Sequence, residues 1–270
     1  MKYSKKNPIG VFDSGVGGLS VLKELVKVLP KENFEYLGDT NRMPYGVRTE
    51  EEVKAFTIEC LKFLEKKEVK TVVIACNTAT SFGLEAARKV YDFNIIGVVE
   101  PACEYSATIT KNKKIALIAT TGTVSSKVYD RTLKEIDDEI ELRSVGAPQL
   151  VLDIENGNFN NDVVKNSIIK YLDKLGDYDY DTIILGCTHF PLARAMFEEV
   201  LKEKGKDVNI VDSGSSTALR LKECLEKDDL LNDEKKPKIN FYATGEVEGF
   251  KNVVDEISEF EKNYSGKSLL

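Results

Sequence analysis

The sequence predicts an α/β fold made of two similar, doubly wound parallel-sheet lobes, related by a pseudo-twofold axis, with the active site in the cleft between them. Three observations support this prediction. Short runs rich in β-branched residues alternate with longer segments of helical periodicity, which is typical of parallel sheets covered by helices. The alternation restarts near residue 114, and the chain has 270 residues, more than one compact domain normally needs.

The predicted elements of the first half follow from hydrophobic spacing. A buried strand at 9–12 is followed by a glycine-rich turn and a helix with Leu19, Leu22 and Val26 on one face. Thr49 and Glu52 have the spacing of a capping box, which marks the start of another helix. The remaining strands of this half are expected at 34–37, 69–75 and 95–99, with a further helix running to residue 91.

The pattern then repeats in the second half. Strands are expected at 114–119, 142–145 and 182–185, with helices at 125–136 and 164–175. Residues 228–238 are acidic and then lysine-rich, which indicates a surface loop. Phe250, Val253 and Ile257 mark a closing helix, and we expect the tail after Lys262 to be frayed.

An internal repeat connects the two halves. The segment FDSG (12–15) is similar to ATTG (119–122), and IACNT (74–78) is similar to LGCT (185–188). Both matches are separated by about 110 residues and occur in the same order, so chance alone is a poor explanation. The repeat therefore supports two lobes of similar fold.

Composition excludes several classes of protein. The net charge of -7 argues against a protein that tracks nucleic-acid phosphates. Residues 1–7 lack the apolar run of a secretory signal, and no apolar stretch reaches the roughly 20 residues that a membrane span needs. We therefore expect a cytoplasmic protein with no membrane and no nucleic-acid partner.

The five cysteines form no Cys-x-x-Cys pair, which disfavours structural zinc and thioredoxin-like chemistry. Cys60, Cys103 and Cys224 lie on predicted helices and are expected in the core. Cys76 and Cys187 each lie between a strand end and a helix start, where the helix dipole and N–H donors favour a thiolate. Either one alone is more simply interpreted as a small buried residue. As a repeated pair with polar neighbours, they are predicted to act together as acid/base groups.

His189 is the only histidine of the chain and follows Cys187 by two residues, so we predict a functional role for it. Pro191 suits the first turn of the helix that is expected to follow. Cys187 and His189 are too few ligands for zinc, and no metal site is predicted.

Ligands of open parallel sheets bind at the carboxyl ends of the strands, where this chain carries small polar residues. The run DSGVGG (13–18) lacks the Gly-x-Gly-x-x-Gly spacing, and Asp13 would repel a pyrophosphate. A carboxylate better suits the ammonium group of an amino acid, whose carboxylate would need neutral donors. The candidate donors are Ser14, Asn77, Thr78, Thr121 and Thr188. The residues thus predict an amino-acid substrate placed between two cysteines.

Five segments together resemble the bacterial glutamate racemases. They are DSGVGGL (13–19), GDT (38–40), PYG (44–46), ACNTAT (75–80) and GCTHFPL (186–192). The resemblance covers nearly the whole chain, in order and with the spacing of the family, so it is more specific than any single motif.

The resemblance implies an enzyme that interconverts L- and D-glutamate without a cofactor and supplies D-glutamate for peptidoglycan. It implies that Cys76 and Cys187 are the catalytic acid/base residues, one on each side of the α-carbon. Asp13, His189 and Glu155 would assist these thiols. The substrate-binding residues implied by it are Asp13, Ser14, Pro44, Tyr45, Gly46, Asn77, Thr78, Thr188 and His189.

The resemblance also bears on domain organisation and assembly. It implies a second lobe inserted into the first, with residues 1–99 and 209–270 in lobe one and residues 100–208 in lobe two. The segment 210–214 would return the chain to lobe one, and the protein would form a homodimer. The acidic motif around Glu155 is loose, so Asp153 competes for the assisting role.

Asn41, Met43 and Phe190 depart from the residues that are more common in the family, which concerns loop geometry and inhibitor sensitivity. Three alternatives stay open. A related racemase could act on aspartate or another amino acid, although Thr188-His189 favours glutamate. A two-lobed amino-acid-binding protein without catalysis would have a similar pocket. A dinucleotide-dependent oxidoreductase would need a better glycine fingerprint than this chain has.

Overall fold

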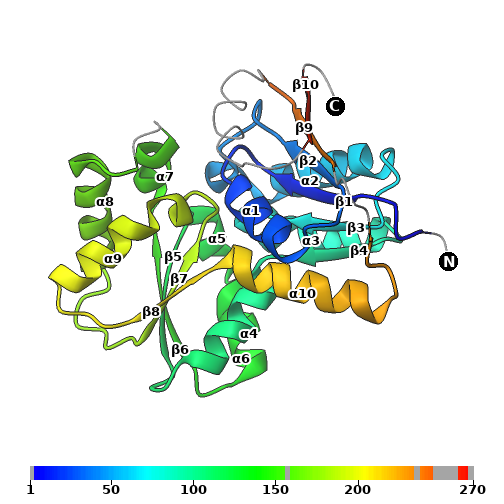
Figure 1. The fold of residues 1–270 in the computed structure, drawn as a ribbon. Coiled ribbons are helices and arrows are strands. Elements are labelled where there is room, and N and C mark those ends of the chain that lie inside the picture. Colours follow the sequence, from blue (N-terminus) through cyan, green and yellow to red (C-terminus); the bar gives the residue numbers. More distant parts are fainter. Residues whose placement is uncertain (1–2, 156–158, 234–237, 246–260, 267–270) are drawn as a thin grey trace.

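Two parallel sheets form the framework of the protein (Figure 1). The computed structural model describes residues 3–155, 159–233, 238–245 and 261–266. The strands of sheet A are β1 (Ile9–Asp13), β2 (Phe34–Gly38), β3 (Thr71–Ile74), β4 (Asn94–Gly97), β9 (Lys238–Ala243) and β10 (Glu261–Gly266). The strands of sheet B are β5 (Lys114–Ala119), β6 (Glu141–Gly146), β7 (Thr182–Gly186) and β8 (Asn209–Asp212).

Both sheets have helices on both faces, as the doubly wound prediction requires. Sheet A packs α1 (Leu19–Val28) and α10 (Ser213–Lys227) on one face and α2 (Glu50–Glu65) and α3 (Asn77–Val90) on the other. Sheet B packs α4 (Val99–Ile109) and α6 (Val128–Ile136) on one face. Its other face packs α7 (Pro148–Glu155), α8 (Asp162–Asp173) and α9 (Arg194–Glu203). Three short elements lie outside these layers, namely η1 (Tyr45–Val47), α5 (Thr121–Ser126) and η2 (Phe190–Ala193).

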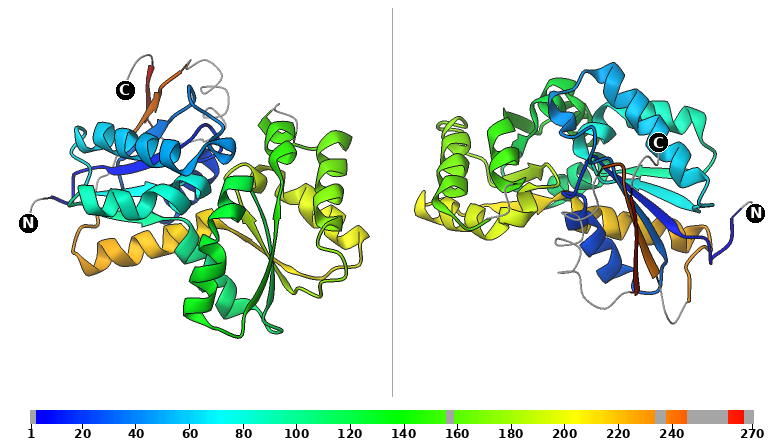
Figure 2. Two further views of the ribbon diagram at one scale, coloured as in Figure 1. Left: turned by 180° about the vertical axis from the view of Figure 1, so that it is seen from behind. Right: turned by 90° about the horizontal axis from the view of Figure 1, so that it is seen from above.

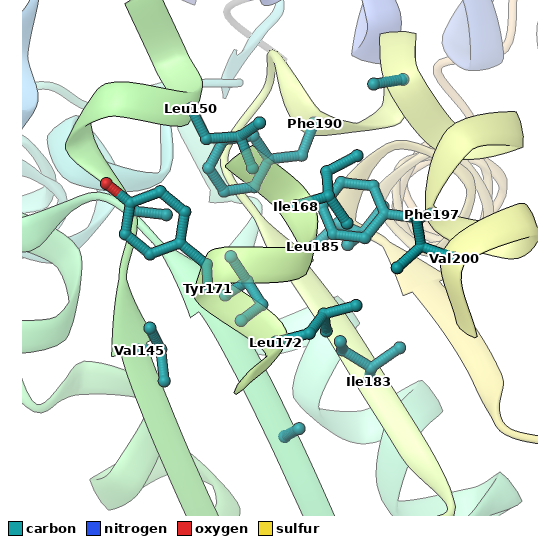
Figure 3. Close-up of a cluster of buried hydrophobic side chains, with 14 of the residues drawn as sticks. Val145, Leu150, Ile168, Tyr171, Leu172, Ile183, Leu185, Phe190, Phe197 and Val200 are labelled. Atoms are coloured by element: carbon teal, nitrogen blue, oxygen red, sulfur yellow. The ribbon is translucent and has the colours of Figure 1, made fainter. Parts of the chain in front are cut away.

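The central strands are apolar throughout because both of their faces are covered. Every residue of β1, β3 and β7 is buried. In lobe two, Ile183 and Leu185 of β7 meet Ile168 and Leu172 of α8 and Phe197 of α9 (Figure 3). Each side chain of this size contributes about 1.5–3 kcal/mol when it is fully buried. The core of lobe two is thus formed where these helices cover β7.

The two lobes repeat one topology. Sheet A contains the order β2-β1-β3-β4 and sheet B the order β6-β5-β7-β8, so the first strand of each set is flanked by its second and third. The helix that follows the fourth strand of each lobe packs against the other lobe. Helix α4 follows β4 of lobe one and packs against α6 of lobe two, whereas α10 follows β8 of lobe two and packs against α1 of lobe one. These two helices also contact each other, and α10, orange in Figure 2, runs along lobe one. The repeat inferred from the sequence is thus confirmed as two similar lobes.

Some predicted element bounds are wrong. The helix expected at 125–136 is two helices, α5 and α6, because Lys127 between them has a left-handed backbone with φ of 57°. The predicted loop at 228–238 ends with Lys238, which begins β9. The tail after Lys262 is not frayed as far as residue 266, since β10 pairs in parallel with β9. The closing helix at 250–257 lies outside the described residues.

The predicted lobe boundary at 208/209 does not coincide with the end of sheet B. Strand β8 pairs with β7 in sheet B, so the chain leaves this sheet at Asp212 rather than at residue 208. Asp212 then caps α10 by accepting hydrogen bonds from the backbone N–H groups of Gly214 and Ser215 at 3.0 and 3.2 Å. As folding units, the ranges 1–99 plus 209–270 and 100–208 remain a prediction.

Within the described ranges, no helix has the length and apolarity to cross a membrane.

Lys70 forms a buried ion pair that fastens the edge of lobe one away from the cleft. Its Nζ donates to Glu32 Oε2 at 2.6 Å and to the backbone carbonyls of Lys5 and Leu230, each at 2.8 Å. The side chains of Lys70 and Glu32 are 0% and 1% exposed. The cation therefore joins the N-terminal segment to the loop after α10.

We expect Lys70→Met to lower the free energy of unfolding by about 3–5 kcal/mol, because Glu32 would keep a buried charge without its partner. Urea unfolding measures this change. The exposed pair of Lys54 and Glu50 provides the control, since Lys54→Met should cost at most about 1 kcal/mol. Equal effects of the two substitutions would contradict the buried role of Lys70.

Candidate active site

The two cysteines singled out in the sequence line one cavity between the lobes. The cavity opens between the carboxyl ends of the two sheets. Its walls come from both lobes, with Cys76 from lobe one and Cys187 from lobe two. The other lining residues are Ser14, Pro44, Tyr45, Gly46, Asn77, Thr78, Thr120, Val151, Glu155, Thr188 and His189.

Cys76 is the N-cap residue of α3, as its predicted position at a helix start requires. Its Sγ accepts a hydrogen bond from the backbone N–H of Ala79 at 3.4 Å and lies 3.6 Å from Ser14 Oγ. The pKa of Cys76 is nevertheless raised to about 12, chiefly by burial and next by the negative charge of Asp13, while the two hydrogen bonds oppose the rise. The hydrogen bond at the helix start does favour the thiolate of Cys76, as expected, but it is outweighed. Desolvation of the charged form is the larger effect.

Cys187 follows β7 in a different local structure from the predicted one. The short helix η2 comes first, and α9 begins only at Arg194, so the thiol does not lie at the start of an α-helix. The partner of Cys187 is instead an imidazole, because Sγ lies 3.7 Å from His189 Nδ1. The opposite ring atom, Nε2, forms an ion pair with Glu155 Oε1 at 3.1 Å, although the angle is not that of a hydrogen bond.

Contacts with Cys187 and Glu155 set the protonation of His189. Burial lowers the pKa of this imidazole, but its contacts with Cys187 and Glu155 outweigh burial and raise the pKa to about 10. Asp153, the competing acidic residue, accepts a hydrogen bond from Gln149 at 2.9 Å and does not line the cavity. The geometry thus places Glu155, and not Asp153, beside His189.

Asp13 lies behind the cavity wall and is fully buried. Its Oδ2 accepts from the backbone N–H of Gly15 at 2.9 Å, and its Oδ1 accepts from Thr188 Oγ1 of the other lobe at 3.3 Å. Burial raises the pKa of Asp13, while the nearby His189 charge and these donors oppose the rise. The carboxyl group therefore links the two lobes, and its charge acts on Cys76.

The glycine-rich turn after β1 serves close packing between the lobes. A Cβ atom on Gly17 would lie 2.5 Å from Thr188 Oγ1 and 2.7 Å from His189 Nδ1. Side-chain atoms of lobe two therefore pack directly against this turn. Within the described residues, no group of three or more histidine, cysteine or acidic side chains is arranged to hold a metal ion.

The loop carrying Pro44, Tyr45 and Gly46 forms a third wall of the cavity, as predicted. Tyr45 is buried and donates a hydrogen bond to Asp39, which also accepts from Arg42 Nε at 2.6 Å. Gly46 approaches lobe two closely, because a Cβ atom there would lie 2.7 Å from Thr120 Cβ.

Thr120 takes the place that was predicted for Thr121. Thr121 is exposed and does not line the cavity, whereas Thr120 Oγ1 lies 2.9 Å from Thr78 Oγ1 of the other lobe. Thr120 is the N-cap residue of α5 and accepts from the backbone N–H of Thr123 at 3.1 Å. The internal repeat aligns Thr120 with Asp13, a signal that could have identified it.

Sequence reasoning also missed the surroundings of Asn77. Its Oδ1 accepts a hydrogen bond from Tyr129 Oη at 2.7 Å, and Ser213 Oγ lies 3.4 Å from the same oxygen. Val151 of α7 contributes an apolar part of the wall. Tyr129 and Val151 belong to no motif named in the sequence, and the segment 210–214 that contains Ser213 was assigned only a connecting role.

The chain is similar to known racemases in both sequence and structure. The sequence model of the Asp/Glu/hydantoin racemase family matches residues 9–221. The glutamate racemase of Thermoanaerobacter pseudethanolicus is 44% identical over 243 residues, which cover 90% of each protein. A glutamate racemase structure from Bacillus anthracis is similar with a TM-score of 0.91 and 37% identity, covering 97% of this chain and 98% of that one. A glutamate racemase from Francisella tularensis, solved in complex with D-glutamate, has a TM-score of 0.89 and 30% identity, covering 98% of both chains.

The state of His189 can be measured directly, because it is the only histidine in the chain. In protein without a histidine tag, we expect the ring ¹⁵N shifts to remain those of an imidazolium at pH 8, with a pKa of about 10. Glu155→Gln removes one anionic partner and should lower this pKa. The pKa of His189 in the folded protein lies above the ordinary value of 6.5, so the contacts of the charged imidazole stabilise the folded state. This contribution to the free energy of unfolding is fully present below about pH 6.5 and is lost as pH rises through about 10. A wild-type midpoint near 6.5 would contradict this assignment.

Proposed function

This chain belongs to the Asp/Glu/hydantoin racemase family, and we propose that it interconverts L-glutamate and D-glutamate, with Cys76 and Cys187 as its two acid/base groups. The observation that carries the proposal is that these thiols come from opposite lobes and line one cavity. The similarity to curated and structurally solved glutamate racemases over nearly the whole chain supports glutamate as the substrate.

Racemisation needs one proton removed from the α-carbon and one returned to its other face. The two enantiomers have equal free energy in water, so the obstacle is the weak acidity of the α-proton. In our proposal, the thiolate of one cysteine takes this proton and the electron pair of the C–H bond passes into the carboxylate. The thiol of the other cysteine then protonates the opposite face. The two cysteines end with their protonation states exchanged, which is general acid/base catalysis by two groups.

The surroundings of the thiols suit different resting states. A thiol whose pKa is raised to about 12 stays protonated at neutral pH, so Cys76 would start as the acid. His189, with a pKa raised to about 10, would be an imidazolium whose Nδ1 lies 3.7 Å from Cys187 Sγ. We therefore assign Cys187 as the base of the resting enzyme. The reverse reaction would begin after the proton has moved from Cys76 to Cys187.

Neutral donors around the cavity would hold the substrate carboxylates and the charge that develops on them. Ser14, Asn77, Thr78 and Thr188 line the cavity with hydroxyl or amide groups. Such donors stabilise an enediolate when they are fixed before the reaction begins. Asp13 would act from behind the wall, where its charge adds to the effect of burial in keeping Cys76 protonated.

Two parts of the proposal derive from the family resemblance. The enzyme would supply D-glutamate for peptidoglycan synthesis in the cytoplasm, and it would work as a homodimer. Gel filtration with light scattering reports the assembly state, and a complementation assay in a D-glutamate auxotroph reports the cellular role.

We expect Cys76→Ala and Cys187→Ala each to lower racemisation by at least about 10³-fold, because general acid/base groups contribute roughly 10²–10⁴-fold and each direction requires both. Circular dichroism measures the conversion of L-glutamate, with L-aspartate assayed in parallel. Cys224→Ala is the matched control, since this half-buried thiol is not part of the cavity wall. Near wild-type turnover in either catalytic variant would contradict the two-thiol proposal, and preference for aspartate would contradict the substrate.

A further inference from the structure

We propose that Tyr129 is a positioning residue that holds the side-chain amide of Asn77 with its N–H groups toward the substrate. Tyr129 does not line the cavity, and it would act only through Asn77. The inference rests on the proposed function, because it assigns the bound group to a carboxylate of glutamate.

The contact between these residues crosses the cleft. Asn77 is the first residue of α3 in lobe one, and Tyr129 lies on α6 of lobe two. Tyr129 Oη donates to Asn77 Oδ1 at 2.7 Å, and both side chains are buried, with exposures of 1% and 2%. Ser213, at the start of α10, places its Oγ 3.4 Å from the same oxygen, which is a weaker contact.

The other end of the amide lacks such a contact. Asn77 Nδ2 is buried and has no hydrogen-bond partner among the residues that the structure describes. A buried amide nitrogen without an acceptor is costly, and native structures rarely leave one unpaired. Since Asn77 lines the catalytic cavity, a bound carboxylate is the acceptor that fits this donor.

The tyrosine hydroxyl decides which end of the amide faces the cavity. Burial raises the pKa of Tyr129, so its hydroxyl keeps the proton and needs an acceptor. The Oδ1 atom of Asn77 provides it. If the amide were rotated by 180°, the hydroxyls of Tyr129 and Ser213 would both lose Oδ1 as their acceptor, and Oδ1 would repel the substrate carboxylate. A phenyl ring at position 129 would remove this preference.

The same contact makes substrate binding depend on the alignment of the lobes. The nearer donor to Asn77 Oδ1, Tyr129, belongs to α6 of lobe two, while Asn77 itself belongs to lobe one. A carboxylate therefore meets a correctly oriented amide only when the lobes are closed on each other. This couples recognition to the geometry that places both thiols in one cavity.

The test compares Tyr129→Phe with wild type by racemisation kinetics and by calorimetric binding of D-glutamate. We expect KM and Kd to rise about tenfold, the effect of one well-placed hydrogen bond, with a smaller change in kcat. Tyr91→Phe is the matched control, because this buried hydroxyl donates to the backbone carbonyl of Ile58 at 2.6 Å and does not line the cavity. It should leave KM and Kd unchanged.

A double-substitution cycle with Asn77→Ala separates positioning from general loss of structure. If Tyr129 acts through Asn77, Tyr129→Phe should weaken binding little further once Asn77 is alanine. Additive effects in the cycle, or an unchanged Kd in Tyr129→Phe, would overturn the inference. Should Tyr129→Phe fail to fold, Ser213→Ala tests the same oxygen and should raise Kd by a smaller factor, and an unchanged Kd there would also overturn it. Wild-type protein that binds D-glutamate without racemising it would instead refute the proposed function, and the Kd comparison would still decide the role of Tyr129.

Discussion

The close approach of the two lobes at the carboxyl ends of their sheets is the constraint on which the site depends. Gly17 leaves room for His189, and Gly46 leaves room for Thr120, so side chains of one lobe reach the backbone of the other. Helices α4 and α10, which contact each other and each pack against the lobe opposite to the strand they follow, also join the two lobes. Without that approach, Cys76 and Cys187 would lie on separate surfaces. The cavity is therefore a property of the pair of lobes, and neither sheet could form it alone.

The lobes share a topology but differ in charge where they meet. Thr78 follows Cys76 by two residues, and His189 follows Cys187 by two residues. Their partners in the other lobe are Thr120 and Asp13, which are also equivalent positions of the internal repeat. Thr78 contacts Thr120 through neutral hydroxyls, whereas the charge of His189 acts on Asp13. A pair of equivalent thiols is thereby placed in unequal surroundings. Two groups that must hold opposite protonation states at the start of a reaction need this inequality.

The sequence predicted the lobes well because strand burial and helix periodicity are local properties that the β-branched runs and the capping box of Thr49 and Glu52 express directly. Its motifs also predicted most of the cavity wall. The sequence did not predict properties that depend on contacts between residues far apart in the chain. The thiolate expected at Cys76 gives way to desolvation, which depends on how deeply the folded chain buries the sulfur. Thr120 and Tyr129 acquire their contacts only when the second lobe is placed.

The central claim is that different groups work on the two faces of the α-carbon, and solvent-deuterium exchange tests it most directly. L-Glutamate is incubated with the purified enzyme in D₂O without added cofactor, and both enantiomers are separated and analysed at low conversion. The account predicts deuterium at the α-carbon of the D-glutamate product, while recovered L-glutamate keeps its protium. Equal early deuteration of product and recovered L-glutamate would point to a single group serving both faces and would contradict the account.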